Sequence, residues 1–183
     1  MKNTILSARL GFVSVAVLAA AATRFMPHAP NFTAIGAMAL FAGACMPSRW
    51  LSLIVPAFAM LVTDAIIGFH PTLWAVYSSF ALITMMGWMI RNKQSVFTIG
   101  AASVAAAVLF FLVTNSAMWI TDQFLPAAQR FYPTNISGLW LAIYNGIPFA
   151  ANTILSQVLY GAVLFGAFHA AKAWKPSLIK VKA

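Results

Sequence analysis

Apolar runs of about twenty residues, separated by short polar segments, constrain this chain more than any other feature. The clearest run lies between Ser95 and Thr121, where Asn115 is the one strongly polar side chain. A helix of about 20 residues covers the roughly 30 Å of a bilayer's hydrocarbon core. Because backbone polar groups in lipid must be hydrogen-bonded within the chain, such runs form helices. The pattern predicts an all-α, polytopic membrane bundle.

Composition agrees with a membrane protein and excludes several other classes. Of the 183 residues, 62% are hydrophobic and 7% charged, which no soluble domain of this size shows. The net charge of +9 is typical of nucleic-acid binding, but the basic residues lie between apolar runs, as in membrane topology. We therefore expect one membrane domain over residues 1–183, with the lipid bilayer as its surroundings and no nucleic-acid partner.

The runs predict six transmembrane helices. Their approximate ranges are 5–24, 31–45, 50–67, 72–90, 96–120 and 148–171, with an outer loop at 121–137. The first run could instead be a signal peptide, but its length favours a retained helix. The final apolar stretch, residues 138–174, would be about 50 Å long as one helix, so we expect a break near Gly146 and Pro148.

The distribution of basic residues predicts the orientation. With the N-terminus inside, six spans place nine of the eleven Lys and Arg residues on the cytoplasmic side. These nine are Lys2, Arg9, Arg49, Arg91, Lys93, Lys172, Lys175, Lys180 and Lys182. Arg24 and Arg130 fall on the outer side. Because cytoplasmic loops are enriched in Lys and Arg, both chain ends are predicted to be cytoplasmic.

The remaining polar residues gather at the outer side. Counting 1.5 Å per residue from the cytoplasmic end of each helix puts Asp64 about 21 Å up, and Asn115 and Asn152 about 30 Å up. Asn145 comes at about 40 Å, above the boundary. The outer loops and their edges add Arg24, His28, Asn31, His70, Asp122, Arg130, Tyr132 and Asn135. Gln157 is an exception, in the cytoplasmic half.

Asp64 is the leading candidate for a functional residue. An acid within an apolar helix costs a few kcal/mol to insert, so it marks a functional site by default. The structural alternative is an ion pair with Arg24 or Arg130 that pins loops over the bundle. Asn115, Asn145 and Asn152 are candidates too, or else form interhelical hydrogen bonds.

Aromatic and histidine residues near the outer boundary allow two interpretations. The Trp and Tyr side chains form either an interfacial belt or a platform for a ring-shaped ligand. They are Trp74, Tyr77, Trp119, Tyr132, Trp140 and Tyr144. His28 and His70 could bind a metal, but no partner lies at ligand spacing. Cys45 stands alone in an apolar run. We therefore predict no resident metal or cofactor.

Ala16 and Ala20 form a small-xxx-small face on the first helix. Such faces let helices approach closely, usually within one chain. The alternative is docking of a partner protein.

Four segments resemble an uncharacterised bacterial family of predicted membrane transport proteins. They are RFMPHAPNFTAIGAMALFAGA (24–44), TDAIIGFH (63–70), FFLVTNSAMW (110–119) and YNGIPFAANT (144–153), in the same order over nearly the whole chain. That family is similar in size, topology and site position to the S components of energy-coupling-factor (ECF) transporters, which capture vitamins. This resemblance implies a bacterial inner-membrane protein with a ligand beneath its outer loops. It also implies contact of Ala16 and Ala20 with an ECF coupling subunit that works with ATPases.

The expected function is capture of a small nutrient at the outer face for uptake, without enzymatic activity. The resemblance implies a corrinoid, with His70 as cobalt ligand, or a flavin, thiamin or other ring compound. The predicted substrate-binding residues are Arg24, His28, Asn31, Asp64, His70, Tyr77, Asn115, Trp119, Arg130, Tyr144, Asn145 and Asn152. The alternatives are a stand-alone proton-coupled carrier using Asp64, a membrane enzyme acting on lipids or quinones, and an assembly subunit without ligand.

Overall fold

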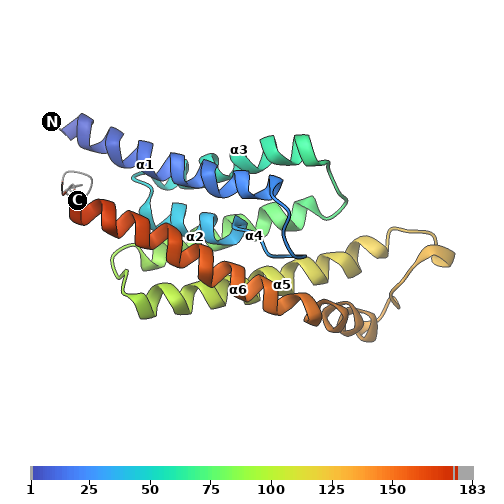
Figure 1. Ribbon diagram of the computed structural model, residues 1–183. Coiled ribbons are helices and arrows are strands. Elements are labelled where there is room, and N and C mark those ends of the chain that lie inside the picture. The colour runs from blue at the N-terminus through green and yellow to red at the C-terminus, as the bar shows by residue number, and fades with distance from the viewer. Residues whose placement is uncertain (1, 175, 177–183) are drawn as a thin grey trace.

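The computed structural model describes residues 2–174 and 176, which form α-helices and two short 3-10 turns without any strand (Figure 1). The helices are α1 (Lys2–Ala22), α2 (Ile35–Cys45), α3 (Arg49–Ile67), α4 (Leu73–Ile90), α5 (Val96–Asp122) and α6 (Ile136–Trp174). The turn η1 (Thr23–Phe25) follows α1, and η2 (Ala127–Gln129) lies between α5 and α6. The predicted all-α bundle is confirmed.

Five helices are long and apolar enough to cross a membrane: α1, α3, α4, α5 and α6. Their outward faces carry large apolar side chains, including Phe58, Leu112 and Val163, which are 62%, 44% and 57% exposed. Broad apolar surface of this kind is unfavourable in water and favourable against lipid. The chain is therefore a membrane-embedded helical bundle.

Helix α2 is shorter than the predicted span over residues 31–45. It begins at Ile35, and its 11 residues measure about 16 Å, roughly half the hydrocarbon thickness. The preceding residues cannot continue it, because Pro30 has no amide hydrogen and Asn31 adopts a left-handed φ of 60°. The chain thus returns from α1 as a non-helical stretch of residues 26–34, called here the α1–α2 segment.

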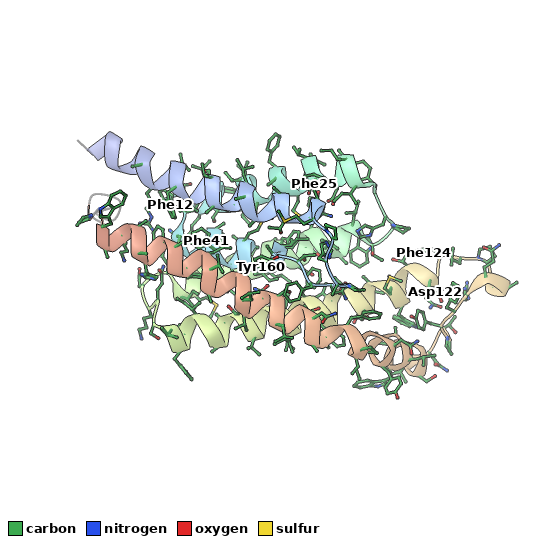
Figure 2. All side chains as sticks on the ribbon, viewed as in Figure 1. Phe12, Phe25, Phe41, Asp122, Phe124 and Tyr160 are labelled. Atoms are coloured by element: carbon green, nitrogen blue, oxygen red, sulfur yellow. The ribbon has the colours of Figure 1, made fainter. Side chains whose placement is uncertain are left out.

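Helix α2 lies inside the bundle. Ten of its eleven residues are buried, and it contacts all five longer helices. A Cβ atom added at Gly43 or Gly87 would collide with the backbone of the opposite helix. The backbones of α2 and α4 therefore lie closer together than any side chain at these positions would allow. On another side, the ring of Phe41, which Figure 2 labels, packs edge-on against the ring of Phe165 with centroids 5.3 Å apart. Close packing of α2 thus replaces the lipid contacts that the longer helices make.

Helix α6 runs without interruption for 39 residues, about 58 Å. The break predicted near Gly146 and Pro148 is a change of direction within one continuous helix, visible in the first turns of α6 (Figure 1). Pro148 has no N–H for the carbonyl of Tyr144, which bends a helix without necessarily ending it.

Helices α5 and α6 pack along each other and extend past the ends of α1–α4 (Figure 1). The loop between them, residues 123–135, is shorter than the predicted 121–137, because α5 continues to Asp122 and α6 begins at Ile136. This hairpin end lies opposite the start of α1 and the end of α6, which share one end of the bundle (Figure 1).

The end of the bundle near the start of α1 is basic. Arg9 Nε donates to the carbonyl of Cys45 at 2.7 Å, and Arg91 Nη2 donates to that of Met46 at 2.8 Å. These bonds satisfy carbonyls left free where α2 ends. The pKa of Arg91 is lowered, mainly because its side chain is partly buried and further because the positive charges of Arg9 and Arg49 lie nearby. Of the basic residues predicted here, Lys175, Lys180, Lys182 and the side chain of Lys2 lie outside the described residues.

Candidate functional site

A cavity of about 350 Å³ lies where α1 and α3 end and α2 and α4 begin. It receives side chains from η1, the α1–α2 segment, the α3–α4 connection and helices α2 to α6. Its lining residues are Arg24, His28, Asn31, Thr33, Ile35, Gly36, Met60, Asp64, His70, Thr72, Val76, Phe110, Thr114, Asn115, Met118, Thr153, Ser156 and Gln157. The volume falls in the range of small-molecule pockets.

The cavity has an exposed mouth and a buried interior. His28, Asn31 and His70 are exposed, whereas Asp64 and Gln157 are 0% and 4% exposed. The exposed residues belong to the loops opposite the basic end. The cavity therefore opens toward that end and reaches inward between the helices.

Arg24 and Asp64 form an ion pair in the cavity wall. Arg24 Nη1 lies 2.6 Å from Asp64 Oδ1 and also donates to the hydroxyl of Thr63. The Tyr77 hydroxyl donates to Asp64 Oδ2 at 2.8 Å, and within the described residues Oδ1 makes no further hydrogen bond. A buried charge without such partners would cost several kcal/mol. Of the two arginines considered from the sequence, the structure pairs Asp64 with Arg24.

Local structure brings these two side chains together. Asp64 lies in the last turn of α3, where its carbonyl accepts the amide of Gly68 at 2.8 Å. Gly68 adopts a φ of 117°, which glycine tolerates without strain and which ends the helix. Arg24 lies in η1, directly after α1, and α1 packs against α3. Two neighbouring helix ends thus supply the two charges.

The α1–α2 segment is fixed to α6. Asn152 Nδ2 donates to the carbonyl of Pro30 at 3.0 Å. The ring of Tyr160, labelled in Figure 2, lies 6.0 Å from the ring of Phe32. Non-helical backbone at membrane depth is tolerated where it is buried in protein or lines a cavity. Here the segment lines the cavity, to which it contributes His28, Asn31 and Thr33.

Helix α6 contributes a polar face that the sequence analysis did not assign to a site. Thr153, Ser156 and Gln157 recur at helical spacing and line the cavity together. The two hydroxyls donate to carbonyls of their own helix, at 3.1 and 3.0 Å. Gln157 Nε2 has no hydrogen-bond partner within the described residues. The spacing 153, 156, 157 in an apolar helix was the available signal.

The predicted ligand residues divide into three groups. Arg24, His28, Asn31, Asp64, His70 and Asn115 line the cavity. Tyr77 bonds to the lining residue Asp64, and Asn152 bonds to Pro30, the neighbour of the lining residue Asn31. The other four, Trp119, Arg130, Tyr144 and Asn145, do not line it.

Two residues of this last group have partners elsewhere, near the α5–α6 loop. Trp119 Nε1 donates to the carbonyl of Pro133 at 2.8 Å, and exposed Arg130 donates through Nε to Leu125 at 2.9 Å. Tyr144 is 67% exposed, and Asn145 is exposed as well.

Asp122, the second acid, holds the α5–α6 loop. Its carboxylate accepts the amide of Phe131 at 3.0 and 3.1 Å and that of Tyr132 at 2.8 Å. Figure 2 shows Asp122 at the far end of α5, beyond helices α1–α4. This acid closes a loop and does not line the cavity.

The other predicted features have clear positions. Ala20 is 5% exposed and Ala16 packs against the core, so other helices of this chain cover Ala20. Within residues 2–174 and 176, no group of three or more His, Cys, Asp or Glu residues could hold a metal ion. Cys45 is buried, with its sulfur 3.9 Å from Gln94 Oε1.

A protein family of unknown function, DUF6580, matches residues 5–178. The chain belongs to this family. No curated protein and no solved structure matches it. The function must therefore be argued from the cavity and its chemistry.

Proposed function

We propose that this protein is a membrane transport protein that binds a small nutrient in the cavity for uptake. The observation that carries the proposal is the buried Arg24–Asp64 pair in the wall of a cavity lined by polar groups from several helices. Ionisable residues inside membrane bundles are costly and mark substrate or ion pathways. A pair serving only to join two helices would need no cavity beside it.

The basic end supports an outward-facing cavity. Arg9, Arg49 and Arg91 lie near one another at the end opposite the mouth. Positive residues mark the cytoplasmic side, so in this proposal the mouth faces outward from a bacterial inner membrane. The resemblance to ECF S components agrees with capture at that face. It makes a coupling subunit with its ATPases the partner to seek by co-purification.

The size of the cavity supports a small ligand. At about 350 Å³ it lies at the low end of the range for small-molecule pockets. A corrinoid is far larger, so we favour a compact compound with at most a small ring system. Phe110, His28 and His70 are the rings in the lining, whereas Trp119 and Tyr144 lie outside it.

Retention of a ligand through purification tests the proposal. The protein is purified gently from its own cells, and co-purifying small molecules are identified by mass spectrometry. Arg24→Ala should lose the compound, whereas Arg130→Ala, which removes an exposed arginine outside the cavity, should keep it. Equal retention by both variants would show that the cavity is not the binding site.

A proton-coupled carrier is the second candidate, favoured by the buried carboxylate of Asp64 in the cavity wall. It predicts that uptake of the identified compound stops when the proton gradient is dissipated. Uptake that persists without the gradient and requires an ATPase partner would favour the first candidate.

A further inference from the structure

Helix α2 begins inside the cavity. Ile35 and Gly36, its first two residues, both line the cavity. The first amides of a helix have no carbonyl one turn earlier to bind, and the N-cap residue, Ala34, provides no side-chain bond. Such a helix start carries about half a positive charge and binds anionic groups. In transporters, the starts of interrupted helices serve anionic substrates in this way.

Gln157 supplies an independent observation at the same place. It is 4% exposed, and its Nε2 is a buried donor without a partner in the described part of the chain. A Cβ added at Gly36 would collide with Gln157 Oε1, so the amide lies against the first turn of α2. Unpaired buried donors are rare because each has lost its hydrogen bonds to water without gaining a partner in the protein. A hydrogen-bond acceptor on the ligand would give Gln157 Nε2 its missing partner.

The charges of the cavity favour an anion over a cation. Asp64 is the one carboxylate in the lining, and Arg24 and Tyr77 already bind its two oxygens. A cationic ligand would therefore find no free carboxylate. An anionic ligand would find the Gln157 amide and the first backbone amides of α2.

We infer that the ligand carries an anionic oxygen group, a carboxylate or a phosphate, bound in the cavity where the start of α2 and Gln157 Nε2 lie next to each other. The rest of the molecule extends past Asn115 toward His28 and His70 at the mouth. This assignment rests on the proposed function and names its substrate class. Gly36 is part of the site because any side chain there would displace the amide of Gln157.

The test offers the purified full-length protein two fractions of an aqueous small-molecule extract of its source cells. Anion exchange separates the anionic compounds from the neutral and cationic ones. Compounds that remain with the protein through gel filtration are identified by mass spectrometry. Phosphatase treatment of the anionic fraction then distinguishes a phosphate ester from a carboxylate.

Variants of Gln157 connect the bound compound to this place. Gln157→Glu puts a negative charge beside the anion and should weaken binding about tenfold or more, since a charged hydrogen bond is worth about 1.5–3 kcal/mol. Gln157→Leu removes the donor without adding charge and should weaken it less. Gln129→Glu adds the same charge at an exposed loop position and should change nothing.

The outcomes separate this inference from the proposed function. A compound retained from the anionic fraction and lost on Gln157→Glu supports both. Retention from the non-anionic fraction alone, or unchanged binding in both Gln157 variants, overturns the anion site and leaves nutrient capture standing. No retention from either fraction overturns both. If Gln157→Glu fails to give a single gel-filtration peak, the result for Gln157→Leu decides.

Discussion

The two acids of this chain, Asp64 and Asp122, are both buried and are held in different ways. Asp122 accepts backbone amides nine and ten residues away, so its bonds close a local loop. Asp64 is paired with Arg24, forty residues away on another helix, beside a cavity. The difference shows that burial of an acid alone does not identify a site. A site is identified by the partner of the acid and by the cavity beside it.

The largest expected effect comes from breaking the Arg24–Asp64 pair. Arg24→Ala leaves a buried carboxylate without its cation, which should lower the free energy of unfolding by about 3–5 kcal/mol. Denaturant-induced unfolding of the detergent-solubilised protein measures it.

Removing both charges sharpens this result. The double variant Arg24→Met/Asp64→Leu should regain much of the lost stability, because apolar replacements of buried pairs are often neutral. It should still fail to retain a ligand. Recovery of both stability and ligand would mean that the pair only joins α1 to α3.

The next effect concerns the loop acid. Asp122→Ala leaves the amides of Phe131 and Tyr132 without their acceptor, at a cost of about 2 kcal/mol. Ligand retention should not change, because Asp122 lies outside the cavity. Mass spectrometry of the purified variant checks this, and loss of the ligand in a folded protein would contradict the separation of the two acids.

A smaller effect is expected at Tyr77. Tyr77→Phe removes the hydroxyl that donates to Asp64 Oδ2 and should destabilise the protein by about 1.5 kcal/mol, since the acceptor is charged. Thermal unfolding compares it with Tyr132→Phe, because Tyr132 contacts the other acid, Asp122, through its backbone amide. Equal shifts in melting temperature for the two variants would show that the Tyr77 hydroxyl does not stabilise the Asp64 carboxylate.

The smallest effect is expected at Arg130, the arginine that the sequence offered beside Arg24 as a partner for Asp64. Arg130→Ala should change the free energy of unfolding by less than about 0.5 kcal/mol, because its side chain is exposed. A loss comparable with that of Arg24→Ala in the same unfolding assay would show that the two arginines are not distinct in role.

Much of the fold could be predicted from the sequence, because apolar runs and lipid thickness together determine where long helices form. The length of α2 could not. Its residues are as apolar as those of a span, and only Pro30 and Asn31 indicate that helix formation starts late. The bend in α6 was recognised as a disruption at Pro148, but the sequence did not show that hydrogen bonding continues through it.

The site was predictable in part. Counting depth along single helices grouped Asp64 with Arg24 and Asn115 correctly, because Arg24 and Asp64 lie near the ends of their helices and Asn115 lies at the same depth along the longer α5. It could not choose between Arg24 and Arg130, since the choice depends on how far α5 and α6 extend beyond the other helices. It also left out Gln157, because the cavity reaches inward to the start of α2, deeper than an outer-surface site.

Thiol labelling from outside the cell shows whether this cavity is the outward-facing ligand site. Cys45 is the chain's one cysteine and is buried. In the variant His28→Cys, the introduced cysteine at the mouth is therefore the thiol that a reagent in solution labels. A membrane-impermeant maleimide should label it in intact cells, and the retained compound should slow that labelling, while Arg130→Cys should react at an unchanged rate. Labelling of His28→Cys only in broken cells, or at a rate indifferent to the compound, would contradict the account.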